Sequence, residues 1–413
     1  MNRSDTRRPR PLLLALAGLA ALGCGRPEGD ALAIATPWPA ADRAAIEAAY
    51  RREAPEARPI AWVPLAPGDD PARLVPALGV DLVLGLPAAD LDRLAAADAL
   101  LPIDGQDPRP WRVARRSGLG LATSITTEST RVDLADRNLA ASVAIDDPRR
   151  DSVALAWAGS ELARRGWGPG YASIVRAAAN ARRAGRGGSA VAAVVRGEAT
   201  AAPGVGVEGA IDDRTTMIRV DGAPAWVEGV ALVRGAEREP EARQLLRVLA
   251  DRGQARPVGP GDPPVDPVGL AADGLVADLL GATLVDAQDE LWAAADALDR
   301  AGRPPVFEGY LDSPPPWPPT SVARLRREEG SAALVDTLAA EISPDREARS
   351  WLLDSWDGPA RPIDGGWIRE AATAAGGRVV REPRFRAWLR GEWTAWARQH
   401  YRRIAREAGK GPA

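Results

Sequence analysis

After its first thirty residues the sequence alternates short apolar runs with longer segments in which apolar residues recur every three or four positions. Continuous apolar runs over residues 31–36, 59–63 and 80–84 are typical of buried strands. Helical patterns lie between them, over residues 42–54 and 71–78. Because strands that alternate with helices pair in parallel through right-handed crossovers, this pattern predicts an α/β fold.

The residues that follow the predicted strands are candidates for ligand contact, since ligands of open parallel sheets bind beyond the carboxyl ends of the strands. Thr36 and Trp38 follow the first strand, and Gly85 follows the third. Ser189 begins a later helix, whose free N–H groups can bind an anion. Ordinary structural roles are open as well: Trp38 as a core or rim aromatic, Gly85 as a turn residue and Ser189 as an N-cap.

Glu208 is a further candidate, because it lies in a loop with Asp212 and Asp213 after a strand predicted over residues 199–207. Carboxylate oxygens of this kind are suited to a hard cation. The alternative is a solvated acidic loop with no ligand. We keep Glu208 as a candidate ligand-binding residue and predict no metal site.

The last third of the chain has a different pattern. Residues 257–272 are rich in Pro, Gly and Asp and read as a linker, and residues 314–319 form a proline-rich spacer or turn. The remaining segments predict helices, over residues 275–298, from residue 321, and over 332–341, 345–353, 365–375 and 382–408. Trp351, Trp356 and Trp367 suggest a small helical core of its own.

The final predicted helix carries an aromatic stripe on one face and arginines on the other. Phe385, Leu389, Trp393, Trp396 and Ile404 recur at helical spacing. Such a helix either packs on its own domain or lies on an anionic membrane surface. We favour the packed helix.

The charge balance disfavours a nucleic-acid partner. The chain has 53 basic and 56 acidic residues and a formal net charge of −3. Binding to a phosphate backbone depends on an excess of positive charge, which this composition lacks.

The composition also argues against an enzyme. A single Cys and a single His exclude a disulfide framework and a Cys/His zinc site, and they leave a Ser-His-Asp triad dependent on His400 in the terminal helix. Asp146, Asp147 and Asp151 surround Pro148 and are interpreted as caps and turns. A glycosidase with paired carboxylates stays open only because acidic residues are numerous. We predict neither catalytic residues nor a cofactor.

The N-terminus has the pattern of an export signal. Arginines precede an apolar run over residues 12–22, which is too short to span a bilayer as a stable helix. Residues 19–24, Leu-Ala-Ala-Leu-Gly-Cys, resemble a bacterial lipobox, which implies that Cys24 is lipidated and becomes the mature N-terminus. A plain signal peptide with an incidental cysteine is the alternative.

Several motifs, in order, resemble the extracellular solute-binding proteins of ABC importers, most closely the ferric-iron and small-anion branch. They are Ala-Ile-Ala-Thr-Pro-Trp at 33–38, Gly-Val-Asp-Leu-Val-Leu-Gly-Leu-Pro at 79–87, Val-Ala-Ile-Asp-Asp-Pro at 143–148, the Gly-Glu element at 197–198 and Glu-Gly-Val-Ala-Leu-Val-Arg at 228–234. The resemblance covers roughly residues 31–255. It implies a two-lobed, type II-like binding-protein fold that captures a small molecule or ion between its lobes and delivers it to an importer permease.

The resemblance gives the chain an expected organisation and location. The expected parts are a signal peptide with lipobox (1–24), an N-terminal α/β lobe (25–130), a second α/β lobe (131–256), a linker with a helix and the proline-rich spacer (257–320) and a C-terminal helical region (321–413). The protein would be a membrane-anchored lipoprotein on the periplasmic side of the cell envelope.

Two departures from this family keep other interpretations open. Iron-binding members use adjacent tyrosines, whereas none of the four tyrosines here is adjacent to another. The passage between residues 103 and 132 is short for this family, which predicts a trimmed lobe. A cell-surface interaction module that no longer carries solute is therefore the alternative function.

The lipid anchor can be tested by Cys24→Ala. We expect this change to release the mature protein from the membrane fraction, because the thioether to the lipid is lost. Immunoblots of separated membrane and soluble fractions measure the result. Retention of the variant in the membrane fraction would contradict lipidation at Cys24.

Overall fold

The computed structural model describes residues 30–65, 71–103, 109–125, 132–181, 189–206, 209–220, 223, 225–258, 267–302, 309, 311–328 and 330–410. These residues form two compact units, each described by itself below. The first unit takes in the described residues of Met1–Leu86, Arg93–Arg115 and Glu228–Gly259. The second takes in those of Pro87–Asp92, Arg116–Val227 and Pro260–Ala413.

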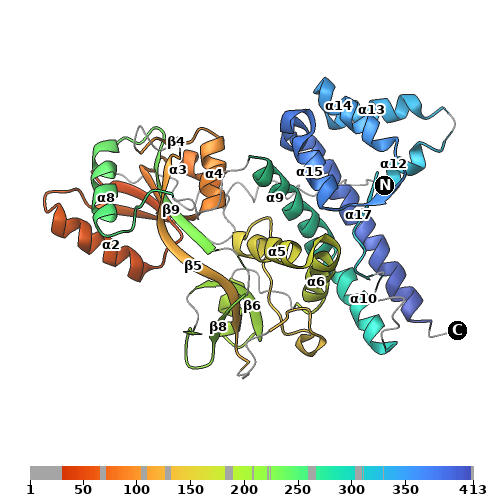
Figure 1. Cartoon of the computed structure of the whole chain (residues 1–413), viewed down its shortest axis with the longest axis horizontal. Coiled ribbons are helices and arrows are strands. Elements are labelled where there is room, and N and C mark those ends of the chain that lie inside the picture. Colours follow the sequence, from red (N-terminus) through yellow and green to blue (C-terminus); the bar gives the residue numbers. More distant parts are fainter. Residues whose placement is uncertain are drawn as a thin grey trace, which may run out of the picture. The chain divides into compact units, whose positions relative to one another are not determined.

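The first unit is built on a parallel sheet, as the sequence predicts. Strand β1 (Leu32–Thr36) lies between β2 (Ile60–Pro64) and β3 (Leu82–Pro87) and is parallel to both. All five residues of β1 are buried. Helices α2 (Ala40–Glu53) and α8 (Glu239–Asp251) pack against each other in this unit (Figure 1). The short helix α3 (Pro71–Leu78) follows the predicted boundaries.

Two long strands have residues in both units. They are β5 (Trp111–Thr123) and β9 (Ala225–Val233). In the first unit, β9 pairs with the short strand β4 (Leu100–Leu101), and Val113 of β5 bridges to Arg256. The helix α4 (Ala88–Ala96) also divides between the units. The sequence gives no sign of β5, whereas residues 228–234 of β9 belong to one of the motifs that resemble the binding-protein family.

The second unit contains an antiparallel part of the sheet. Its strands β6 (Ala201–Gly206) and β8 (Thr216–Arg219) pair with β5, and β7 (Gly209–Ala210) pairs with β8. A Cβ at Gly120 of β5 would overlap the carbonyl oxygen of Ile218, so this close strand approach requires glycine. The helices of this part are α5 (Ser152–Arg165), α6 (Trp167–Ala179) and α7 (Ala190–Val195), with a 3₁₀ turn η2 (Arg137–Leu139).

The C-terminal residues of the second unit are almost entirely helical. They form α9 (Pro267–Leu280), a π-helical turn η3 (Gly281–Val285), α10 (Gln288–Arg300), α12 (Thr320–Leu325), α13 (Ala332–Ile342), α14 (Arg346–Trp356), α15 (Gly365–Thr373), the 3₁₀ turn η4 (Ala374–Gly377), α16 (Arg378–Arg381) and α17 (Pro383–Ala408). Strands β10 (Pro316–Trp317) and β11 (Arg361–Pro362) pair antiparallel. The helices predicted from residue 321 onward lie close to these bounds. The two units, the second of which includes this helical region, confirm the predicted α/β fold class with an added helical region.

The aromatic stripe of α17 packs inside the second unit, so the packed-helix interpretation is confirmed. Phe385, Leu389, Trp393 and Ile404 are all at most 1% exposed. Burying each such side chain contributes about 1.5–3 kcal/mol. In Figure 1 this helix, in blue, runs beside α10. Four of the five stripe residues therefore face protein, and the fifth, Trp396, is partly exposed.

The tryptophans of the helical region do not form a core of their own, contrary to the sequence expectation. Trp317 lies 4.8 Å from Trp367 and 6.1 Å from Trp351 between ring centroids. These residues belong to one hydrophobic core that also includes Leu119, Tyr171 and other residues of the α5–α6 region. Trp167 of α6 donates its indole N–H to the carbonyl of Ile363 at 3.0 Å. The C-terminal helices thus complete the core of the second unit.

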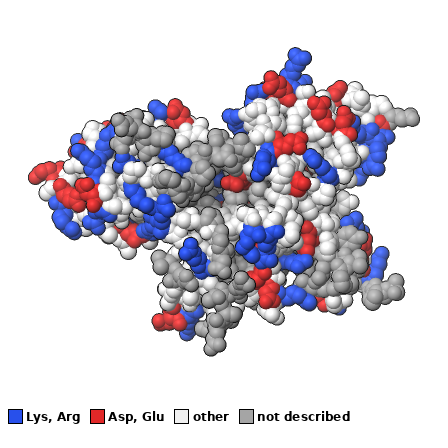
Figure 2. All heavy atoms as spheres, viewed as in Figure 1, with Lys and Arg blue, Asp and Glu red and all other residues white. Residues whose placement is uncertain are grey.

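The arginine face of α17 is held by acidic residues of neighbouring helices. Arg386 donates to Asp278 of α9 at 2.6 Å, and Arg390 donates to the same carboxylate at 3.2 Å. Arg402 pairs with Glu290 of α10 at 2.6 Å. On the face drawn in Figure 2, blue and red side chains are interspersed and do not gather into one basic surface.

Asp278→Asn tests how strongly this contact holds α17. Asp278 is 3% exposed, and the change removes the charge that its two arginines share. We expect a loss of about 1–3 kcal/mol in the free energy of unfolding, measured by urea denaturation. Asp336→Asn, on the exposed face of α13, is the control and should stay within about 0.5 kcal/mol of the wild type. Equal stability of the two variants would contradict this role of Asp278.

Candidate functional site

Three predicted ligand-contact residues of the first unit meet at the carboxyl ends of β1 and β3. The indole of Trp38 lies against Gly85, where a Cβ would overlap the ring. Gly85 has φ of +81°, a left-handed conformation that glycine adopts without strain. Thr36 is 1% exposed, and its hydroxyl oxygen accepts a hydrogen bond from the backbone N–H of Trp38 at 3.1 Å. Thr36 and Gly85 therefore fix the position of Trp38.

Arg115 of β5 also lies over the indole ring of Trp38. The guanidinium carbon lies 4.2 Å from the centroid of the indole ring, which is a cation–π contact. Trp38 is only 6% exposed as a result of these neighbours. The guanidinium of Arg115 is therefore more accessible than the indole beneath it, since its side chain is 39% exposed.

Two carboxylates complete this group, which we call the Trp38 cluster (Trp38, Asp42, Gly85, Arg115 and Glu228). Arg115 donates to Asp42 at 2.6 Å, and its Nε lies 3.9 Å from Glu228. Glu228 accepts a hydrogen bond from the indole N–H of Trp38 at 2.7 Å. The side chains of Arg115 and Asp42 are 39% and 36% exposed, whereas that of Glu228 is 16% exposed. The cluster presents guanidinium donors and carboxylate acceptors side by side at the surface.

Sequence reasoning missed Arg115 and Glu228 as site residues. Arg115 lies in β5, whose sequence alternates poorly and contains two glycines, so no strand pattern marks it. Glu228 lies in the predicted strand β9, but nothing in the sequence relates it to Trp38. Asp42 lies in the first turn of α2 and pairs with Arg115.

In the second unit, Ser189 has the structural role that the sequence offered as an alternative. Its hydroxyl oxygen caps α7 by accepting from the N–H of Ala192 at 3.2 Å. Asp146 accepts from the N–H of Ala190 at 2.7 Å, so the same helix start is already occupied by a carboxylate. Burial raises the pKa of Asp146, and the charges of Asp151 and Asp147 raise it further.

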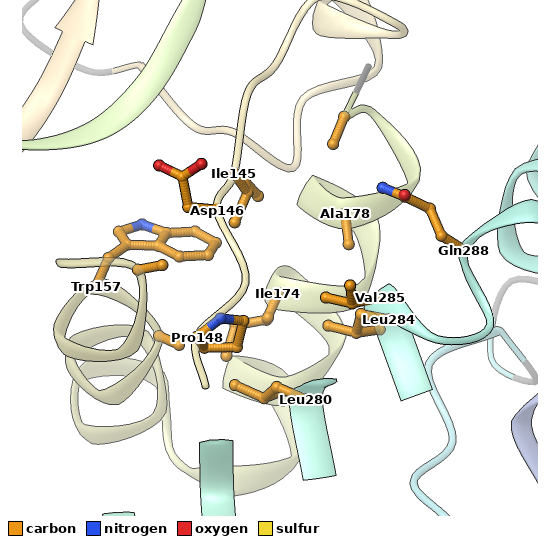
Figure 3. A pocket seen from close by; sticks show the side chains of 13 residues that line it. Ile145, Asp146, Pro148, Trp157, Ile174, Ala178, Leu280, Leu284, Val285 and Gln288 are labelled. Carbon is orange, nitrogen blue, oxygen red and sulfur yellow. The ribbon is translucent and has the colours of Figure 1, made fainter. Parts of the chain in front are cut away.

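A small cavity lies beside Asp146 in the second unit (Figure 3). Its volume is about 30 Å³, and its labelled lining includes the indole of Trp157 and the side chains of Ile174, Leu280 and Gln288. One ordered water needs roughly 10–15 Å³, so this cavity is too small for a solute.

The predicted turn around Pro148 is stabilised by hydrogen bonds from the side chain of Arg149. Arg149 makes paired hydrogen bonds to Asp147, at 2.9 and 2.7 Å, and to Asp286, at 2.7 and 2.8 Å. Its side chain lies over Gly281, the first residue of the π-helical turn, where a Cβ would overlap it. Burial lowers the pKa of Arg149, but the two carboxylates outweigh this effect and raise it. These acids are structural, as the sequence interpretation holds.

Two predicted residues, Cys24 and Glu208, lie outside the described residues. Within the part of the chain that is described, no set of three or more His, Cys, Asp and Glu side chains is placed to hold a metal ion. In that same part, no helix combines the length and the apolar character needed to cross a bilayer.

Solved structures that resemble this chain are periplasmic binding proteins. AfuA from Actinobacillus pleuropneumoniae, with fructose-6-phosphate bound, is 15% identical over 57% of this chain and 88% of its own, with a TM-score of 0.45. Iron-bound HitA from Pseudomonas aeruginosa is 16% identical over 60% of this chain and 98% of its own, with a TM-score of 0.46. The apo ferric ion-binding protein A of Pasteurella haemolytica is 14% identical over 57% and 87%, with a TM-score of 0.44.

No protein-family model matches the sequence, and no curated protein matches it.

Two aspartates that cap helices of the second unit have pKa values shifted in opposite directions. Asp151 caps α5 by accepting from the N–H of Ala154 at 2.7 Å, and Asp345 caps α14 by accepting from that of Ala348 at 2.8 Å. Burial raises the pKa of Asp151 despite its cap bonds. The bond from Ala348 lowers the pKa of Asp345, which is solvent-exposed and lies near Arg378.

The two Asp→Asn variants should therefore show opposite pH dependence. Stability from Asp151 is present at acid pH and is lost as the pH rises through its raised pKa, so Asp151→Asn gains stability relative to the wild type toward neutral pH. Stability from Asp345 is present above its ordinary pKa and is lost as the pH falls through its lowered pKa, so Asp345→Asn loses stability relative to the wild type toward neutral pH. Asparagine caps a helix about as well as aspartate, so the caps are retained. Parallel curves of melting temperature against pH for the two variants would contradict these assignments.

Proposed function

We propose that this protein is an extracytoplasmic solute-binding protein that captures a small polar solute and delivers it to an ABC importer. The observation that carries the proposal is the Trp38 cluster at the carboxyl ends of β1 and β3, where Arg115 and Asp42 are exposed above a fixed indole. Open α/β sheets bind ligands at this edge.

The chemistry of the cluster supports a hydrophilic solute. The guanidinium of Arg115 donates hydrogen bonds in a planar fork, and the carboxylates of Asp42 and Glu228 accept them. A solute with several hydroxyl or charged groups can exchange for the Arg115–Asp42 bond, which is solvent-exposed and of low net stability. Contact with Trp38 then requires Arg115 to move off the ring.

The proposed location and partners follow from the sequence. The export signal and the lipobox-like segment ending at Cys24 support a lipoprotein anchored in the membrane on the periplasmic side. The ordered motifs of residues 31–255 support an importer permease as the partner and capture of the solute between two lobes. The protein takes part as a binding component, without catalysis and without a cofactor.

A ligand screen by thermal shift tests the proposal. The full-length protein is heated with sugars, sugar phosphates, amino acids, thiamine, small carboxylates and ferric citrate, each in turn. A bound solute raises the melting temperature by mass action. At a free solute concentration of one hundred times Kd, the free energy of unfolding increases by about 2.7 kcal/mol. We expect at least one class to produce a saturable shift.

Two arginine variants test whether the solute that shifts the melting temperature binds at the Trp38 cluster. Arg115→Gln should weaken binding about tenfold or more, because a charge-assisted hydrogen bond is lost. Arg52→Gln, on the exposed end of α2, should leave binding unchanged. The proposal fails if no solute shifts the melting temperature, a result that would favour the alternative of a cell-surface interaction module.

A further inference from the structure

The C-terminal helical region contains a second hollow, with a volume of about 140 Å³. This is roughly ten times the space that one water molecule needs, so it can hold a small organic molecule. One wall is formed by the start of α12 and the proline segment before it, including Pro315, Pro316 and Pro319. The other wall is formed by α17. The hollow is thus built entirely from residues of the second unit.

The α17 wall supplies aromatic surface and a carboxylate. Trp393 and Trp396 line the hollow together with Glu392. Trp396 is partly exposed and stacks on His400, with ring centroids 4.5 Å apart and an interplanar angle of 14°. Glu392 accepts a hydrogen bond from the hydroxyl of Ser321 at 2.6 Å through one carboxylate oxygen. This bond fixes the carboxylate beside the aromatic wall.

The α12 wall supplies a positive charge. Arg324 lines the same hollow, and its side chain is exposed. Among the described residues, none forms an ion pair with Arg324. The hollow therefore offers a carboxylate with an aromatic surface on the α17 wall, and a guanidinium with prolines on the other wall.

We propose that this hollow is a binding site for a small zwitterion, such as a betaine or an amino acid. Its cationic nitrogen lies against Trp396 and Glu392, because aromatic faces and carboxylates both attract cations. Its carboxylate is bound by Arg324, whose planar fork matches carboxylate geometry. Methyl or methylene groups of the ligand contact the prolines. This site is independent of the Trp38 cluster.

Isothermal titration of the full-length protein with glycine betaine tests the site. We expect saturable binding with a Kd of the order of 0.1–1 mM. Glu392→Gln and Arg324→Gln should each raise that Kd about tenfold, since hydrogen bonds and contacts to charged groups contribute about 1.5 kcal/mol or more. Both positions are at the surface, so circular dichroism should show an unchanged fold.

Three controls separate the possible outcomes. Arg327→Gln, whose side chain bonds to the carbonyl of Ala323 on its own segment, should bind like the wild type. Tetramethylammonium, which lacks a carboxylate, should bind more weakly and be indifferent to Arg324→Gln. Arg115→Gln should not change betaine binding.

Several results would overturn the assignment. These are the absence of saturable heat, an unchanged Kd in Glu392→Gln, or equal binding of tetramethylammonium and betaine. Loss of betaine binding in Arg115→Gln would place the ligand at the Trp38 cluster; this inference would then fail while the proposed function stands.

Discussion

Burial of the apolar stripe of α17 is the constraint on which the second unit depends. The helix brings Phe385, Leu389, Trp393 and Ile404 into the same core as the helices α5 and α6. Each buried side chain of this size stabilises the fold by about 1.5–3 kcal/mol, and aromatic pairs add about 0.5–1.5 kcal/mol. The region that the sequence presents as an appendage therefore contributes a large part of the interior. Its removal would expose the tryptophans that now pack against one another.

Arginine carries most of the polar contacts that orient these elements. Arg386 and Arg390 reach Asp278, Arg402 reaches Glu290, and Arg149 binds two aspartates at once. A guanidinium can bind two carboxylates in a fixed geometry, which a lysine ammonium cannot do. Most of these pairs join segments that lie far apart in the sequence.

The same pairing shapes the Trp38 cluster in the first unit. Gly85 allows the indole to lie close to the backbone, and Arg115 lies over the ring. Within the cluster, Arg115 and Asp42 are more exposed than Glu228 and Trp38. Because an exposed ion pair contributes little net stability, the cluster can exchange its internal bond for a ligand bond. This edge is suited to binding because the indole of Trp38 is fixed and the Arg115–Asp42 pair over it can exchange partners.

The sequence by itself determined the elements with strong local patterns. Buried strands such as β1 and β3 are continuous apolar runs, and α17 shows its aromatic stripe at helical spacing, so periodicity alone identifies them. It also determined that Thr36, Trp38 and Gly85 lie at one edge, because parallel strands end on the same side of a sheet. Only the tertiary structure decided the rest. β5 has glycines and arginines where a strand pattern needs apolar residues. Its Gly120 allows the close approach of β8, and its Arg115 contacts Trp38. The pairing of Arg115 with Asp42 and Glu228, and the single core shared by α17 and α6, join residues far apart in the chain, and no local pattern encodes contacts made across such distances.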